Sequence, residues 1–154
     1  MKRKMCFRIA FAILVIGIMI AVFLFSSQSG EDSNHLSKGI LERIFEFFNV
    51  DADPLKLDQY NLVLRKIAHF SLYFLLGTGT MGFLLTTSLK VKYSFVLSLL
   101  FCILFAATDE LHQFLSGTRN GNPLDVLLDS AGALLSILLL SFAVKVKDRM
   151  ITRR

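Results

Sequence analysis

Residues 9–25 read IAFAILVIGIMIAVFLF, an unbroken apolar run with a single glycine. A helix of about 20 apolar residues crosses the roughly 30 Å hydrocarbon core of a bilayer. Lys2, Arg3 and Lys4 precede the run, as in a secretory signal peptide, but the apolar core of a signal peptide is only about 7–15 residues long. The SSQSG stretch that follows, residues 26–30, is a poor small-x-small cleavage site. The run therefore predicts an uncleaved membrane anchor.

Further apolar stretches follow along the chain. With 154 residues, of which 54% are hydrophobic, the chain is too short for two domains and too apolar for an ordinary soluble one. We predict an all-α fold, a polytopic membrane helical bundle formed by a single domain over residues 1–154. Four transmembrane helices are expected over about 7–25, 67–87, 93–110 and 126–146.

The charges are segregated along the chain in a way that orients the bundle. Eleven of the 17 basic residues lie at the N-terminus, in the loop with Lys90 and Lys92, or in the C-terminal tail, together with a single acid, Asp148. The positive-inside rule places these three segments, and so both termini, in the cytoplasm of a multi-pass protein. Because the basic residues follow the topology and do not line one face of a soluble domain, we exclude nucleic acid as a partner.

The first outer loop carries its own helical pattern. Between residues 36 and 50, apolar residues recur every three or four positions, which places them on one face of a helix. We predict an amphipathic helix that lies at the membrane interface. Its apolar residues are Leu36, Ile40, Ile44, Phe47 and Phe48.

Three clusters of polar and ionisable residues adjoin the predicted spans, and the charge rule puts all three on the outer side. Ionisable groups at membrane depth are expensive, so they are functional-site candidates by default. On the last span, Asp129 shares a stripe with the small residues Gly132 and Ser136, which lets a neighbouring helix approach closely. We predict that the clusters converge on one site. They are Arg65, Lys66, His69 and Tyr73; then Asp109, Glu110, His112 and Gln113; then Arg119, Asp125 and Asp129.

Four motifs carry a family resemblance when they are taken together. They are SSQSG at 26–30, RKIAHF at 65–70 with Tyr73 and Gly77, ATDELHQF at 107–114, and Arg119 followed by Asp125, Asp129 and Gly132. With these motifs the chain resembles the VanZ-like family of small bacterial membrane proteins, whose founding member is associated with teicoplanin resistance. The resemblance implies a polytopic protein of the bacterial cell membrane and a contribution to glycopeptide tolerance. It implies no settled reaction.

The residue types favour a site for an amphiphilic anion at the outer leaflet. Basic side chains can clamp phosphate or carboxylate oxygens, while histidines and carboxyl groups exchange protons. The expected catalytic residues are His69, Asp109, Glu110, His112 and Asp129. The expected substrate-binding residues are Arg65, Lys66, Tyr73, Gln113, Arg119 and Asp125.

Two other interpretations of the same residues stay open. The acids and bases nearly balance, so they can form a purely structural ion-pair network that joins the helices. Asp109 and His112, with helical Asp-x-x-His spacing, can instead supply metal ligands together with Asp125, Asp129 and His69. Because no recognisable metal motif is present, we predict no metal and no cofactor.

Two function classes fit the pattern. The first is phosphoryl or head-group transfer on a lipid-linked substrate, favoured by two histidines beside several acids. The second is binding without turnover of an envelope lipid, a lipid-linked cell-wall precursor or a lipophilic glycopeptide. Proton-coupled transport is a third class, which is hard to build from four short spans without oligomers. The expected partners are membrane lipids with such a precursor or glycopeptide, and the sequence leaves both turnover and oligomeric state open.

Overall fold

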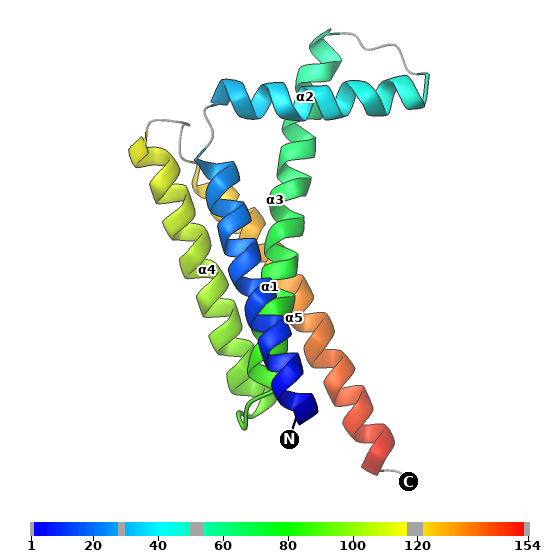
Figure 1. The fold of residues 1–154 in the computed structure, drawn as a ribbon, viewed down its shortest axis with the longest axis vertical. Helices are drawn as coiled ribbons and strands as arrows, with labels where there is room; N and C mark the ends of the chain where they lie inside the picture. The colour runs from blue at the N-terminus through cyan, green and yellow to red at the C-terminus, as the bar shows by residue number, and fades with distance from the viewer. Residues whose placement is uncertain (1, 28–29, 50–53, 117–121, 153–154) are drawn as a thin grey trace.

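The structure is a computed structural model that describes residues 2–27, 30–49, 54–116 and 122–152. Almost all of these residues belong to five helices, so the predicted all-α fold is confirmed over the described ranges (Figure 1). The helices are α1 (Lys2–Ser26), α2 (Gly30–Phe47), α3 (Pro54–Leu85), α4 (Val91–Ser116) and α5 (Pro123–Thr152).

Four of the helices are long and apolar enough to cross a membrane, as predicted. They run past the apolar stretches at their polar ends: α3 begins at Pro54 and not near residue 67, and α4 continues to Ser116. The apolar run marks only the part of a helix that hydrocarbon surrounds, whereas backbone hydrogen bonding continues beyond it. The candidate spans are Lys4–Ser26, Leu57–Leu85, Val91–Leu115 and Pro123–Thr152.

Helix α2 lies across one end of the bundle, nearly perpendicular to the spanning helices (Figure 1). It begins before the predicted start at residue 36, and it ends at Phe47. Asn49, in the turn that follows, has a φ of 51°, a left-handed conformation that asparagine tolerates at the end of a helix. The predicted last residue, Val50, lies outside the described residues. The position of helix α2 at a membrane interface stays a prediction.

Polar contacts fasten α2 to the first turns of α3. Lys38 Nζ lies 2.6 Å from Asp58 Oδ1. The amide oxygen of Asn34 accepts hydrogen bonds from Asn61 Nδ2 at 3.3 Å and from Arg65 Nη1 at 2.9 Å. The side chain of Arg65 therefore connects α2 to the spanning bundle.

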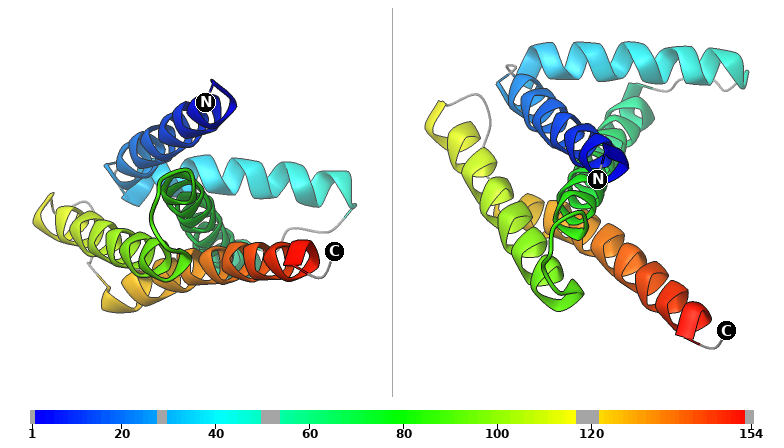
Figure 2. Two further views of the ribbon diagram at one scale, coloured as in Figure 1. Left: turned by 90° about the horizontal axis from the view of Figure 1, so that it is seen from below. Right: turned by 60° about the horizontal axis from the view of Figure 1, so that its bottom comes forward.

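Helix α3 is the centre of the bundle and packs against α1, α4 and α5 (Figure 2). Its contact with α5 is the closest, because glycines remove the side chains between the two backbones. A Cβ atom on Gly132 would collide with the carbonyl oxygen of Phe70, and one on Gly77 would lie 2.7 Å from the carbonyl oxygen of Ala133. The predicted stripe of Asp129, Gly132 and Ser136 is buried in this contact.

The basic segments gather at the end of the bundle opposite α2. The beginning of α1, the α3–α4 turn and the end of α5 all lie there (Figure 1). Lys4, Lys90 and Lys147 are exposed in these segments. We call this the basic end and the opposite one the α2 end.

Candidate functional site

A polar cavity of about 390 Å³ opens between α3, α4 and α5 at the α2 end. Ligand pockets in proteins measure about 300–1,000 Å³. Seven of its nine lining residues are polar or charged, and all seven are residues that the sequence singles out. The lining is Leu62, Arg65, Lys66 and His69 of α3, Glu110 and Gln113 of α4, and Asp125, Leu128 and Asp129 of α5.

An imidazole and a carboxyl group face each other in the wall of the cavity. His69 Nδ1 lies 3.6 Å from Asp129 Oδ2, which is within ion-pair range and longer than a hydrogen bond. Asp129 is only 3% exposed, and its Oδ1 has no hydrogen-bond partner among the described residues. The close approach of α3 and α5 at Gly132, one turn further along, brings the two side chains together. An acid that holds one imidazole nitrogen orients the ring for proton exchange through the other.

The basic side chains of the cavity are already engaged. Lys66 Nζ lies 2.8 Å from Asp125 Oδ1, and both side chains are well exposed, so this pair contributes little stability. The guanidinium of Arg65 bonds the neutral amide oxygen of Asn34. Both cations therefore have partners that an incoming anion can replace or join.

Glu110 connects α4 to the beginning of α5. Its Oε1 accepts a hydrogen bond from the backbone N–H of Asn122. The side chain of Asn122 in turn accepts from the N–H of Leu124 at 3.2 Å, which caps the first turn of α5. This chain of bonds holds Asp125 and Asp129 in register with α4.

A second polar layer lies deeper in the bundle. Asp109 is 7% exposed and accepts a hydrogen bond from Gln113 Nε2 at 3.1 Å. Ser26, at the end of α1, lies beside the Asp109 carboxyl group. Tyr73 is completely buried, and its hydroxyl has no hydrogen-bond partner among the described residues. Asp109, Ser26 and Tyr73 belong to the interior and not to the wall of the cavity, which Gln113 reaches.

Besides Asp109 and Tyr73, two further expected site residues are absent from the described cavity lining. The ring of His112 packs against Phe23 of α1, with centroids 5.1 Å apart, and it does not line the cavity. Arg119 lies outside the described residues. Over the described ranges, no group of three or more His, Cys, Asp or Glu side chains is arranged to hold a metal ion.

The sequence reasoning missed the apolar and neutral parts of the site. Leu62 and Leu128 line the cavity, and Asn34 and Asn122 position its charged residues. Leu62 stands seven residues before His69, two helical turns away on the same face, so its spacing could have revealed it. The asparagines carry no such signal, because their partners lie on other helices.

Comparison with known proteins adds the family and nothing further. No curated protein and no solved structure matches the chain. The model of the VanZ/LLP1 family matches residues 11–144. This match includes two of the candidate membrane helices in full and most of the first and the last, and it contains every residue that lines the cavity. The chain, a multi-pass membrane protein by its four apolar helices, therefore belongs to the VanZ/LLP1 family.

Proposed function

We propose that the polar cavity binds the phosphate-bearing head group of an anionic amphiphile of the cell envelope, an envelope lipid or a lipid-linked cell-wall precursor. The observation that carries the proposal is the lining of this cavity: two cations, a histidine, three carboxyl groups, a glutamine and two leucines around about 390 Å³. A contribution to tolerance of glycopeptides such as teicoplanin follows if the bound lipid belongs to the pathway that these antibiotics block. The lipophilic glycopeptide itself is the alternative ligand.

The charges of the cavity favour a head group with more than one kind of polar atom. Arg65 and Lys66 supply donors for phosphate oxygens, and an arginine fork can bind two oxygens at once. Glu110 and Asp129 supply acceptors for hydroxyl or amine groups of the same molecule. Leu62 and Leu128 give the hydrocarbon chain of a lipid an apolar surface on which to leave the site.

Acid–base chemistry on the bound head group is favoured by one observation, the His69–Asp129 pair. A histidine held by a buried carboxyl group can take up and return a proton near neutral pH. The competing interpretation, a non-catalytic network that joins the helices, is favoured by the Lys66–Asp125 pair and the Glu110–Asn122 bond.

The proposed site implies binding of a phosphate lipid that depends on the two cations. In detergent micelles, native mass spectrometry should detect a polyprenyl monophosphate bound to the protein and far less of the uncharged polyprenol. Replacing both cations, Arg65→Gln with Lys66→Gln, should weaken binding by at least about tenfold, because a hydrogen bond to a charged group contributes about 1.5–3 kcal/mol. Lys147→Gln, at the basic end, is the matched control and should bind normally. Equal binding of phosphate and alcohol would contradict the proposal.

We further propose that the α2 end faces the outside of a bacterial cell and that both termini are cytoplasmic. The exposed lysines of three separate segments at the basic end support this orientation. With Cys6 and Cys102 replaced, a cysteine introduced by Glu46→Cys should react with a membrane-impermeant maleimide in intact cells. A cysteine introduced by Lys90→Cys should react only after the cells are permeabilised. Labelling of position 90 from outside would reverse the orientation and remove the cavity from the outer leaflet.

A further inference from the structure

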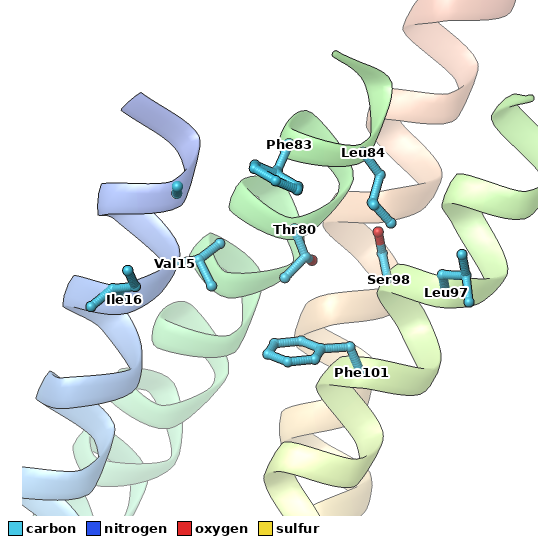
Figure 3. A pocket seen from close by; sticks show the side chains of 9 residues that line it. Val15, Ile16, Thr80, Phe83, Leu84, Leu97, Ser98 and Phe101 are labelled. Atoms are coloured by element: carbon cyan, nitrogen blue, oxygen red, sulfur yellow. The ribbon is translucent and has the colours of Figure 1, made fainter. Parts of the chain in front are cut away.

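An apolar groove of about 390 Å³ lies between α1, α3 and α4, in the half of the bundle near the basic end (Figure 3). Side chains from the three helices surround it, with Ile16, Thr80 and Phe101 on three sides. Thr80 stands 11 residues after His69, which is about 16 Å along a helix. The lining is Ala12, Val15, Ile16, Thr80, Phe83, Leu84, Leu97, Ser98 and Phe101.

This groove is separate from the polar cavity. On α3, Tyr73 and Leu76 come between His69 of the cavity and Thr80 of the groove, and both are completely buried in the core. The groove's two hydroxyl groups are engaged within the protein. Thr80 Oγ1 donates to the carbonyl oxygen of Leu76 at 2.9 Å, and Ser98 Oγ lies 3.9 Å from Met81 Sδ. The lining therefore offers hydrocarbon contact and few free polar groups.

The groove exists because α1 packs tightly on α3 and stands away from α4. A Cβ atom on Gly79 would lie 2.8 Å from Val15, and one on Gly82 would lie 2.5 Å from the ring of Phe11. These glycines draw α1 toward α3. Since α1 has few contacts with α4, the space between these two helices stays open.

A fixed cation stands at the end of the groove. Arg8 lies one helical turn before Ala12, on the same face of α1. Its Nε and Nη2 donate to Thr86 Oγ1 at 3.2 Å and to the Thr86 carbonyl oxygen at 3.0 Å. These two bonds hold the guanidinium at Thr86, two residues beyond Leu84 of the groove lining, with Lys90 and Lys92 exposed at the same end of the bundle.

We propose that this groove seats an acyl chain of an anionic phospholipid from the leaflet at the basic end, with its phosphate at Arg8. An apolar groove alone does not select a lipid, because lipid tails are as apolar as the side chains that line it. Selection between lipids comes from the charge of Arg8, since one basic residue near a membrane surface favours an anionic lipid by about fivefold. This second lipid site goes beyond the proposed function and does not depend on it, because none of its residues lines the polar cavity.

The absence of tryptophan from the chain allows a direct test. Phe101→Trp places the only tryptophan in the groove, and Phe142→Trp places one on the exposed surface of α5 as a control. The protein is reconstituted in vesicles that contain phosphatidylcholine and phosphatidylglycerol, with either one or the other lipid dibrominated. Bromine quenches tryptophan fluorescence, so comparison of the two mixtures gives the relative affinity of the two lipids for the site. A tryptophan in the groove should report a preference of about fivefold for the anionic lipid, the equivalent of about 1 kcal/mol.

Two charge variants on the reporter background decide the result. Arg8→Gln should remove the preference, while Arg149→Gln, an exposed arginine on α5, should leave it intact. Equal affinity for both lipids at position 101, or a preference that survives Arg8→Gln, would overturn the proposal. If Phe101→Trp does not fold, Leu97→Trp supplies a second reporter in the same groove. Binding of a polyprenyl phosphate at the polar cavity is measured separately. A negative result at one site therefore contradicts the proposal for that site alone.

Discussion

A single replacement of His69 by leucine is expected to be among the most destabilising changes in the bundle. Asp129 is 3% exposed, and the imidazole is the ion-pair partner of its carboxyl group. Removing the partner of a buried carboxylate leaves that charge uncompensated, which costs about 3–5 kcal/mol in soluble proteins. Replacing both members, His69→Leu with Asp129→Val, should restore most of the stability, because packed apolar side chains substitute well for a buried pair.

The measurement is the thermal unfolding midpoint of the detergent-purified protein together with the yield of monodisperse protein. His35→Leu is the matched control, since His35 is an exposed histidine of α2, and it should behave like the unmodified chain. If the double variant were as unstable as the single one, the two side chains would not act as a pair.

Function is expected to be lost when His69 is replaced by glutamine, even at wild-type abundance in the membrane. Glutamine keeps hydrogen bonding but cannot exchange a proton near neutral pH. Loss of a general acid or base typically slows a reaction by about 10²–10⁴-fold. The assay is teicoplanin tolerance, with outer-leaflet lipid composition as a second readout, in cells that express each variant. His112→Gln is the matched comparison, because the ring of His112 packs on Phe23 and not in the cavity, and we expect a smaller effect from it.

The outcomes separate the three interpretations of the cavity. Loss of function in His69→Gln, with normal binding of polyprenyl phosphate, supports acid–base chemistry. Normal function in His69→Gln but not in the His69→Leu and Asp129→Val double variant supports binding without proton exchange. Normal function in both variants would leave only a structural network, and the proposed function would then be wrong.

The spanning helices were predictable because hydropathy is a local property. Each apolar run, such as residues 9–25, requires a helix in hydrocarbon whatever surrounds it, since no water is available to pair its backbone. The first and last residues of these helices were less predictable. The polar turns that begin α3 at Pro54 and that carry α4 on to Ser116 depend on contacts with α2 and α5, and not on hydropathy.

The sequence by itself also determined which ionisable residues gather at the α2 end, because span order and helical periodicity place them at one end and on defined faces. Only the tertiary structure decided which of them meet. On α4, Glu110 bonds Asn122 at the beginning of α5, whereas His112, about 160° further around the helix axis at 100° per residue, packs on Phe23 of α1. Likewise, His69 meets Asp129 because Gly77 and Gly132 bring the backbones of α3 and α5 together. The rotation and register of one helix against another are set by such packing, which involves residues far apart in the chain.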